Sequence, residues 1–442
     1  MNYPFNLTHV GAENCVTGSC HLMELPGSIN IMVDCGLTMG GDTALSLSQM
    51  PVKPSELDYL FITHAHIDHI GRIPDLIDLG FDGEIITTHG TNALLIPMLE
   101  DALAFTDRSE KEIKVLSARI NDLSWGFEYN QSFSLKKGIK FKLKNAGHIL
   151  GSCFIRFEIP VKEKTPFSVI FSGDLGSINT PILPDPDIPD HCDLLILEST
   201  YGDRNHEDRT KRIENLSAML RKALADKGKI YIPAFALGRT QELIYEMDRI
   251  FTREKWDTKI PVFIDSPLGL KITGIYSSLS EFWDKEARTL FKKGDHPIDF
   301  KKLFAVENQR DHKRILNIPG PAIIVAGSGM CTGGRILDHL ENSLEDSKND
   351  VIFVGYQAKE TPGREIIKYA RRKNGYVNLN GQKVAINAAI HKLTGYSAHA
   401  DQKGLVGFVE SMGEKPGKIK LVHGEPGSQK VLRNILYSKG CK

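Results

Sequence analysis

The sequence predicts an α/β protein with two domains of different architecture. A chain of 442 residues exceeds what one hydrophobic core usually serves. Up to residue 202, short apolar runs recur between turn residues, and few helical patterns interrupt them. From residue 203, strand and helix patterns alternate, which indicates a parallel sheet covered by helices. We therefore expect a first domain over residues 1–202, a second over 203–387, and a return to the first over 388–442.

The first region contains apolar segments of strand length, most of which end at a polar residue. These segments are Ile29–Asp34, Leu57–Thr63, Glu84–Thr88, Lys140–Lys144, Cys153–Ile159, Phe167–Ser172 and Leu194–Ser199. Helical patterns occur at Thr91–Thr106 and Glu110–Asn121. Many strands with few helices are typical of an α/β sandwich.

The second region alternates regularly. The expected helices are Asp208–Asp226 and Leu237–Arg253, and the expected strands are Lys229–Phe235, Pro261–Asp265, Ala322–Ala326 and Val351–Tyr356. A hairpin turn at Asn380–Gly381 and a strand at Lys418–His423 follow. We expect this last strand to rejoin the first domain.

The composition is that of an ordinary globular protein. Hydrophobic residues make up 41% and charged residues 25% of the chain, and no low-complexity segment occurs. The sequence has neither a secretion signal nor an apolar run of membrane-spanning length, so we expect a cytoplasmic protein without a membrane partner. The seven cysteines include no CxxC pair, which argues against a cysteine-type zinc module.

Charge is distributed unevenly between the two regions. The whole chain is neutral, with 55 basic and 55 acidic residues, but residues 203–387 hold 32 basic and 25 acidic ones. The remainder is acidic by the same margin. An acidic domain suits cation binding, and a basic companion suits a phosphate-rich substrate such as RNA.

The densest group of metal-ligand side chains is His64-Ala65-His66-Ile67-Asp68-His69, which directly follows the apolar run LDYLFIT. Imidazole and carboxylate groups are the ligands that zinc uses outside thiolate sites, and a loop that leaves a rigid strand can direct them at one point. A histidine-rich polar turn is the structural alternative. Asp34, His148 and Asp174 also follow or precede strand patterns, where a single such residue is usually only a turn former.

In this order, Asp34, the HxHxDH segment, His148 and Asp174 resemble the four opening motifs of the metallo-β-lactamase superfamily. Glu198 in ESTYG, His399 in GYSAHAD and His423 in LVHGE resemble the three further motifs of its β-CASP nucleases. This group includes the endonuclease of pre-mRNA 3′-end cleavage and its bacterial and archaeal relatives. PAFALGRTQE, GSGM and GYQAKETPGR are similar as well, so the resemblance extends from about residue 7 to about 425.

The resemblance implies an αββα sandwich with an inserted β-CASP α/β domain of mainly parallel sheet, and an active site in the cleft between them. It also implies two zinc ions, which share and deprotonate one water. The ligands would be His64, His66 and His148 for one ion and Asp68, His69 and His423 for the other, with Asp174 as the bridge. Asp34 would orient a ligand histidine without binding metal.

The same resemblance makes His399 the proton donor to the leaving ribose oxygen, with Glu198 beside it to hold its pKa near 7. Asp68 and Asp174 complete the catalytic set. The alternative for His399 is a histidine at a helix N-terminus that Ser397 or Asp401 caps, and the residues by themselves favour that alternative.

The resemblance further implies that elements of the second region hold the substrate phosphates. These are Arg239, the turn of Ser328, Gly329 and Met330, and Arg364. Glycine turns after parallel strands expose N–H groups to anions, although most are simple connections. The sequence assigns no role to His206.

The function we expect is a zinc-dependent ribonuclease that hydrolyses RNA phosphodiester bonds with two metal ions, as an endonuclease, with 5′–3′ exonuclease cutting left open. We exclude a small-molecule hydrolase of the metallo-β-lactamase type, because such an enzyme does not contain the roughly 185 residues inserted after the ESTYG segment. A β-CASP DNA nuclease and a non-catalytic RNA-binding scaffold stay as alternatives. The resemblance favours RNA over DNA, because the DNA-repair nucleases of the group lack a histidine at the position of His423. The complete set of ligand residues argues against a scaffold that has lost activity. A homodimer is compatible with the sequence, which decides neither the oligomeric state, the natural RNA nor the balance of cleavage modes.

Overall fold

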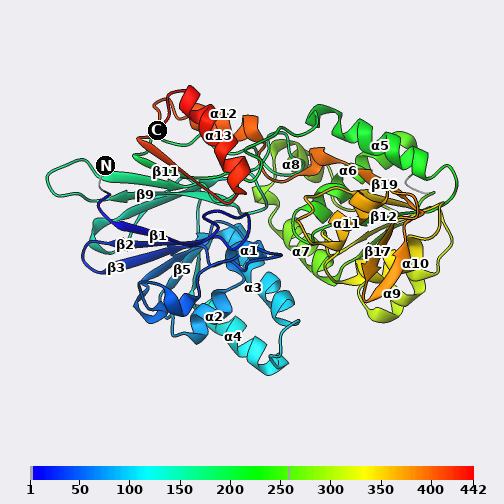
Figure 1. Cartoon of the computed structure of the whole chain (residues 1–442), viewed down its shortest axis with the longest axis horizontal. Coiled ribbons are helices and arrows are strands. Elements are labelled where there is room, and N and C mark those ends of the chain that lie inside the picture. Colours follow the sequence, from blue (N-terminus) through cyan, green and yellow to red (C-terminus); the bar gives the residue numbers. More distant parts are fainter. Residues whose placement is uncertain (1–2, 257–258) are drawn as a thin grey trace. The chain divides into compact units, whose positions relative to one another are not determined.

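A computed structural model of the chain describes residues 3–256 and 259–442, which form two compact units (Figure 1). The first unit combines Met1–Asn205 with Ala398–Lys442, and the second is His206–Ser397. The domain boundaries expected from the sequence, at 202/203 and 387/388, stay predictions.

The first unit contains two six-stranded sheets. One has the order β1 (Asn6–Gly11), β2 (Cys20–Leu25), β3 (Ile29–Val33), β4 (Tyr59–Phe61), β5 (Glu84–Thr88) and β6 (Ser124–Phe127). The other has the order β20 (Lys418–Val422), β11 (Leu194–Glu198), β10 (Phe167–Phe171), β9 (Cys153–Ile159), β8 (Lys140–Asn145) and β7 (Ser132–Ser134). Strand β20 pairs in parallel with β11, so the end of the chain completes a sheet begun before residue 200.

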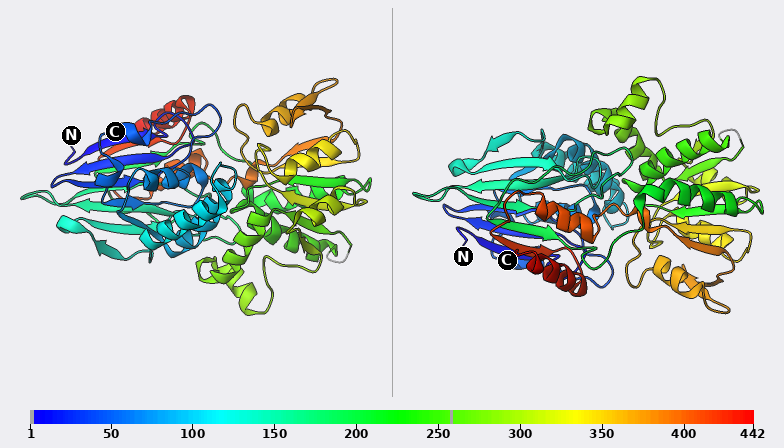
Figure 2. Two further views of the ribbon diagram at one scale, coloured as in Figure 1. Left: turned by 90° about the horizontal axis from the view of Figure 1, so that it is seen from below. Right: turned by 90° about the horizontal axis from the view of Figure 1, so that it is seen from above.

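Apolar side chains fill the space between these sheets. Phe61 of β4 meets Phe141 and Phe157 of the other sheet edge to face, with ring centroids 5.0 and 4.8 Å apart. A second cluster joins the outer face of the β20–β7 sheet to α12 (Gln402–Glu410) and α13 (Pro426–Ser438). The helices α1 (Ile67–Ile70), α2 (Ile73–Asp78), α3 (His89–Leu103) and α4 (Glu110–Leu123) lie along the β1–β6 sheet (Figure 2). This arrangement confirms the αββα sandwich.

The second unit is built on one fully parallel sheet. Its order is β14 (Leu303–Ala305), β13 (Val262–Asp265), β15 (Ala322–Ala326), β12 (Lys229–Pro233), β16 (Asp350–Phe353) and β19 (Ala389–Lys392). Its helices are α5 (Arg212–Ala223), α6 (Arg239–Glu254), α7 (Pro267–Ser278), α8 (Lys285–Lys292), α9 (Gln309–Leu316), α10 (Arg335–Ser343) and α11 (Pro362–Tyr369). The hairpin of β17 (Tyr376–Leu379) and β18 (Gln382–Ala385) turns at Asn380 and Gly381, both with positive φ, as a two-residue turn of this composition requires.

Both faces of this parallel sheet are buried. Tyr231, Ile324 and Phe353 pack against α10 and α11 on one face. Ile230 and Val325, their neighbours along the strands, point to the opposite face and are buried too. Burial on both faces is the usual condition for a parallel sheet, and it confirms the inserted α/β domain.

Some expected element boundaries were wrong. The strand expected over Leu57–Thr63 is formed only by Tyr59–Phe61, because a 3-10 turn over Pro54–Glu56 precedes it and the chain turns toward the ligand residues after Ile62. The helix expected from Asp208 begins with a 3-10 turn over Arg209–Lys211. Further 3-10 turns occur at Leu47–Gln49, Lys136–Gly138, Ser280–Phe282 and Thr394–Tyr396.

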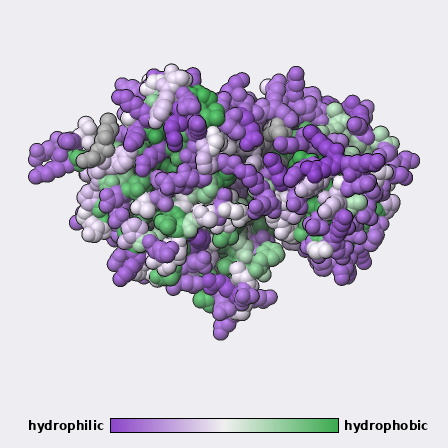
Figure 3. Space-filling model, viewed as in Figure 1, coloured by the Kyte–Doolittle hydropathy of each residue, from purple (hydrophilic) through white to green (hydrophobic). Residues whose placement is uncertain are grey.

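The surface is mostly polar. Hydrophilic residues cover most of the face drawn in Figure 3 in both units, with apolar residues in small patches. Among the described residues, no helix combines the length and the apolar character needed to cross a membrane.

Candidate metal centre

The ends of strands in both sheets of the first unit bring the predicted ligand residues together. Asp34 follows β3, Asp174 lies three residues after β10, and His423 follows β20. His64 lies three residues after β4, and His148 precedes β9. Because polar side chains at the ends of buried strands can point to one place from a rigid frame, this edge is suited to an ordered polar site.

The first group of ligand atoms surrounds His66. The Nδ1 atom of His66 lies 3.0 Å from Nε2 of His64 and 3.1 Å from Nε2 of His148. The Oδ2 atom of Asp174 lies 3.5 Å from Nε2 of His64 and 3.6 Å from Nε2 of His148. Ligands on a tetrahedral zinc ion are about 3.4 Å apart, so these four atoms have the spacing of one ion's ligands.

The second group uses the other oxygen of the same carboxylate. The Oδ1 atom of Asp174 lies 3.3 Å from Nε2 of His69 and 3.5 Å from Nε2 of His423. These two nitrogens are 3.1 Å apart, and Oδ2 of Asp68 lies 3.5 Å from Nε2 of His423. Asp174 therefore belongs to both groups, one oxygen to each. Among the described residues its buried Oδ1 has no hydrogen-bond partner, which fits a ligand of a cation.

Three of the predicted ligand histidines are held through the ring nitrogen that faces away from the other candidate ligand atoms. Nδ1 of His69 lies 2.7 Å from Oδ2 of Asp34, and Nδ1 of His423 lies 3.1 Å from Oγ1 of Thr200. Nδ1 of His64 lies 3.1 Å from Oγ1 of Thr63. Such contacts fix the orientation of a metal-binding imidazole.

Thr63 is a residue that sequence reasoning missed. Its backbone N–H donates to Oδ1 of Asp34 at 2.8 Å, and its hydroxyl lies 3.0 Å from Oδ2. The available signal was its position directly before the HxHxDH segment. Asp34 itself has a φ of 59°, in the left-handed region that non-glycine residues seldom adopt.

Two glycines let the site loops approach closely. A Cβ atom on Gly36 would lie 1.7 Å from the carbonyl oxygen of Asp68, and one on Gly176 would lie 1.9 Å from that of Gly147. Any larger residue would force the loops of Asp68 and His148 away from their partners.

The protonation of the site histidines follows their surroundings. Burial lowers the pKa of His64 and His148 well below the usual value and that of His66 to about 4. Burial also opposes charge on His69 and His423, but Asp174 raises the pKa of both. The lowered pKa values favour neutral rings in the first group, and the raised pKa values mean that a cation at the second group would compete with protons there.

His399 lies beside these groups and faces Glu198. Nδ1 of His399 is 3.2 Å from Oε1 of Glu198 and 3.8 Å from Oδ2 of Asp174. Glu198 is fixed by the N–H groups of Leu175 at 2.8 Å and Thr200 at 3.2 Å. His399 is fixed by a strand-like bridge to Gly176. Backbone groups therefore hold both His399 and Glu198 in place.

The pKa of His399 is raised to about 9, above the value near 7 that proton donation favours. Burial lowers this pKa, but Glu198 and Asp174 together raise it more. From the sequence, we expected Glu198 alone to raise the pKa of His399. A cation bound to Asp174 would offset the effect of that carboxylate and lower the pKa of His399 again. The helix cap considered as an alternative is Asp401, whose side chain accepts from the N–H of Gly404.

The second unit holds the residues expected to bind substrate phosphate. The turn of Ser328, Gly329 and Met330 follows β15, and the N–H of Gly363 donates to the carbonyl of Met330. This places the turn next to the first turn of α11, where Arg364 is exposed. Arg239, in contrast, is 6% exposed, ion-paired with Glu242 and stacked over the ring of Tyr396.

One further cluster of metal-ligand types lies in the second unit. The Oδ2 atom of Asp265 is 2.6 Å from Nδ1 of His312 and 2.7 Å from Nε2 of His339. These are hydrogen-bond distances, shorter than the spacing between ligands of one ion. Arg335 also donates to Asp265, at 2.7 Å. A cluster that already includes a guanidinium is a hydrogen-bonded support and not a cation site.

Comparison with known families agrees with this geometry. The profile of the metallo-beta-lactamase superfamily matches residues 14–234, and that of the Beta-Casp domain matches residues 240–366. The profile described as the Zn-dependent metallo-hydrolase RNA specificity domain matches residues 383–440. A protein named as a ribonuclease from Thermus thermophilus is 34% identical over 97% of this chain and 95% of its own length. The chain belongs to the β-CASP ribonuclease family of the metallo-β-lactamase superfamily.

Two further relatives carry a different name. Proteins named as the transcription termination factor FttA from Methanococcus maripaludis and Methanothermobacter thermautotrophicus are 29% and 30% identical. They match 97% and 98% of this chain but only 68% and 69% of their own length. As a β-CASP protein, the chain is a metallo-hydrolase that binds divalent metal, and the two ligand groups are its candidate metal sites.

Proposed function

We propose that the chain is a zinc-dependent ribonuclease that hydrolyses RNA phosphodiester bonds with two bound ions. The observation that carries this proposal is the sharing of Asp174 between two groups of ligand atoms, with the His399–Glu198 pair beside them. The name of the Thermus relative and the RNA specificity profile over residues 383–440 support RNA as the substrate.

The first ion would be held by His64, His66 and His148, the second by Asp68, His69 and His423, and both by Asp174. Nitrogen and carboxylate ligands without thiolate suit zinc. Two such ions would supply an activated water and neutralise charge that develops on a phosphate. The protein itself orients the ligands, since Asp34, Thr63 and Thr200 each hold a ligand histidine through its other nitrogen.

His399 would act as the general acid. Its Nδ1 atom faces Glu198, so Nε2 is the atom that would deliver a proton to the leaving ribose oxygen. Glu198 stabilises the protonated ring and fixes its orientation.

In the second unit, the Ser328–Met330 turn and Arg364 would contact substrate phosphates. The turn lies beside the N-terminus of α11, where N–H groups favour an anion. Arg239 would have to exchange its ion pair with Glu242 for a phosphate, so we assign it a smaller part.

We expect metal analysis of the purified protein to find about two zinc ions per chain, because seven ligand residues exceed the four that one tetrahedral ion accepts. Elemental analysis of undamaged protein after gel filtration measures this directly. One tightly held ion, or none, would contradict the two-metal arrangement.

RNA cleavage should depend on this metal. Protein is incubated with 5′-labelled and with internally labelled RNA, with and without a chelator, and DNA of the same sequence serves as the control. We expect cleavage of RNA only, loss of cleavage with chelator, and recovery on addition of zinc. Internal fragments would identify endonuclease cutting, and nucleotides released from the 5′ end would identify exonuclease cutting. Cleavage that persists in chelator, or preference for DNA, would refute the proposal.

A further inference from the structure

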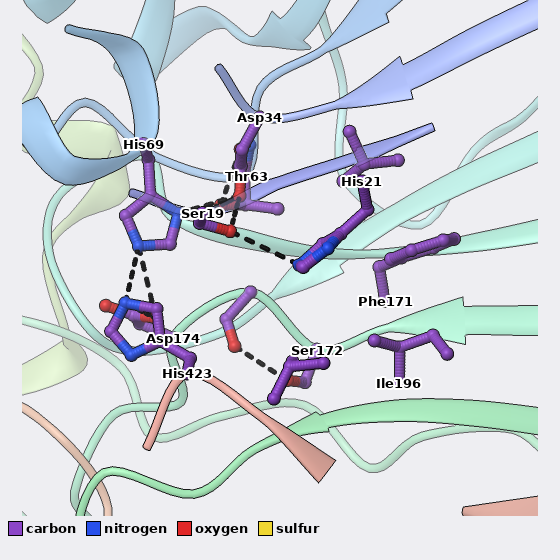
Figure 4. A pocket seen from close by; sticks show the side chains of 13 residues that line it. Ser19, His21, Asp34, Thr63, His69, Phe171, Ser172, Asp174, Ile196 and His423 are labelled. Carbon is purple, nitrogen blue, oxygen red and sulfur yellow. Dashed lines mark hydrogen bonds and ion pairs between the residues drawn. The ribbon is translucent and has the colours of Figure 1, made fainter. Parts of the chain in front are cut away.

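A row of polar side chains extends from Asp34 into the core of the first unit, on the side away from the ligand atoms. The hydroxyl of Ser19 donates to Oδ2 of Asp34 at 3.2 Å. Nε2 of His21 lies 3.5 Å from Oγ of Ser19, and Nδ1 of His21 lies 3.0 Å from Nδ1 of His9. Figure 4 shows Ser19 between Asp34 and His21.

His21 occupies a position where a core residue is expected. On strand β2 it shares a face with Met23 and Leu25, which belong to the apolar core between the two sheets. It is 3% exposed, and its ring stacks on Phe171 of the opposite sheet with centroids 6.0 Å apart. An apolar residue would fill this position without the free-energy cost of burying a polar ring. The presence of His21 here therefore indicates that its ring nitrogens form hydrogen bonds that matter.

The chemistry of each partner determines the direction of the hydrogen bonds. A carboxylate only accepts, so both the Ser19 hydroxyl and Nδ1–H of His69 donate to Asp34. Since the Ser19 hydrogen is committed to Asp34, its oxygen accepts from Nε2–H of His21. Nδ1 of His21 is then an acceptor for Nδ1–H of His9. Every hydrogen bond in the row donates toward Asp34.

His21 is kept neutral, as this pattern requires. Burial, followed by the neighbouring His9, His69 and His423, lowers its pKa well below the usual value. A cavity of about 10 Å³, the size of one water, lies between His21, Ser19 and the ligand residues His69 and Asp174 (Figure 4). A water there would support the long contact between His21 and Ser19.

We propose that Ser19 and His21 are positioning residues for the second cation site: they orient the Asp34 carboxylate, which in turn fixes His69 with Nε2 directed at the ion. This proposal rests on the proposed function for the presence of two ions. It predicts the larger effect on the second site, because Asp34 contacts His69 directly, whereas it reaches His64 of the other group only through Thr63.

The test measures the two stepwise Zn²⁺ dissociation constants by competition with a chromophoric chelator. Ser19→Ala should weaken one constant about tenfold, at the lower end of the effect of outer partners of metal ligands. His21→Leu should weaken the same constant by about threefold to tenfold. His21→Gln should bind nearly as the unchanged protein does, because the glutamine amide N–H can take the place of Nε2–H.

Two controls separate positioning from general damage. Met23→Leu changes a core residue on the same face of β2 and should leave both constants unchanged. In a His423→Ala background, which lacks a ligand of the second site, Ser19→Ala should change the remaining constant by less than about twofold. The melting temperatures of the metal-free variants show whether any of them is poorly folded.

Equal weakening of both constants, or His21→Gln binding as poorly as His21→Leu, would overturn the proposal in favour of a packing role. A protein that binds only one zinc ion would overturn it too. If the protein binds two ions but does not cut RNA, the proposed function fails while the zinc constants still decide this inference.

Discussion

Asp174→Asn should abolish cleavage, with a loss on the order of 10³-fold or more, because it removes the one carboxylate shared by both ligand groups. Its two oxygens lie 3.3 to 3.6 Å from four different histidine nitrogens. Bound metal is worth several kcal/mol of transition-state stabilisation, and each 1.36 kcal/mol is a factor of ten in rate. Zinc content and cleavage rate measured on the same sample test this.

Asp193→Asn is the matched control for this prediction. Asp193 precedes β11 at the opposite end of the same sheet, where its carboxylate accepts from the N–H and hydroxyl of Ser168. This variant should keep both ions and the rate. An Asp174→Asn protein that retains two zinc ions and cleaves RNA at the original rate would show that the shared carboxylate is not a metal bridge.

His399→Ala should separate proton delivery from metal binding. We expect it to keep both zinc ions and its affinity for RNA but to lose about 10²–10⁴-fold in cleavage rate, the usual contribution of a general acid. In the unchanged protein the rate should fall as pH rises through the pKa of His399, because only the protonated ring donates. That limb of the pH profile should be absent from the His399→Ala protein.

His423→Ala is the contrasting variant. His423 faces Asp174 at 3.5 Å and His69 at 3.1 Å, as a ligand of the second group does. Zinc content should therefore fall from two ions toward one, together with activity. The reverse pattern, with zinc lost from the His399 variant and kept by the His423 variant, would exchange the two roles.

The HxHxDH segment could be picked out as a candidate metal site because it follows an apolar strand pattern, whereas the division of the predicted ligands into two groups came from the resemblance to β-CASP nucleases. His64 after LDYLFIT and Asp34, the partner of a predicted ligand, after INIMV are examples, and the structure places both beyond strand ends in the same region of the first unit. The parallel sheet of the second region was predicted from the alternation of patterns. These signals are local, so one sequence is enough to show them.

Ser19, His21 and Thr200 could not be anticipated, since their roles depend on contacts between segments that are separate in the sequence. Ser19 meets Asp34, and Thr200 meets His423 across 223 positions of sequence. His21 has no neighbour in the sequence that marks it, because its setting comes from the pairing of β2 with β1 and from Phe171 of the other sheet. Strand pairing and sheet packing determine these contacts, and a hydrophobic pattern does not specify them.

The pairing of β20 with β11 has a consequence for the chain during its synthesis. Glu198 leaves the ribosome more than two hundred residues before its partner strand, whose Val422 is paired with it in the folded protein. A nascent or prematurely ended chain that lacks residue 423 contains all members of the first candidate ligand group but not all members of the second. On the proposed function, the enzyme would stay inert while it is translated from RNA, its proposed substrate, and become competent only when its last strand is in place.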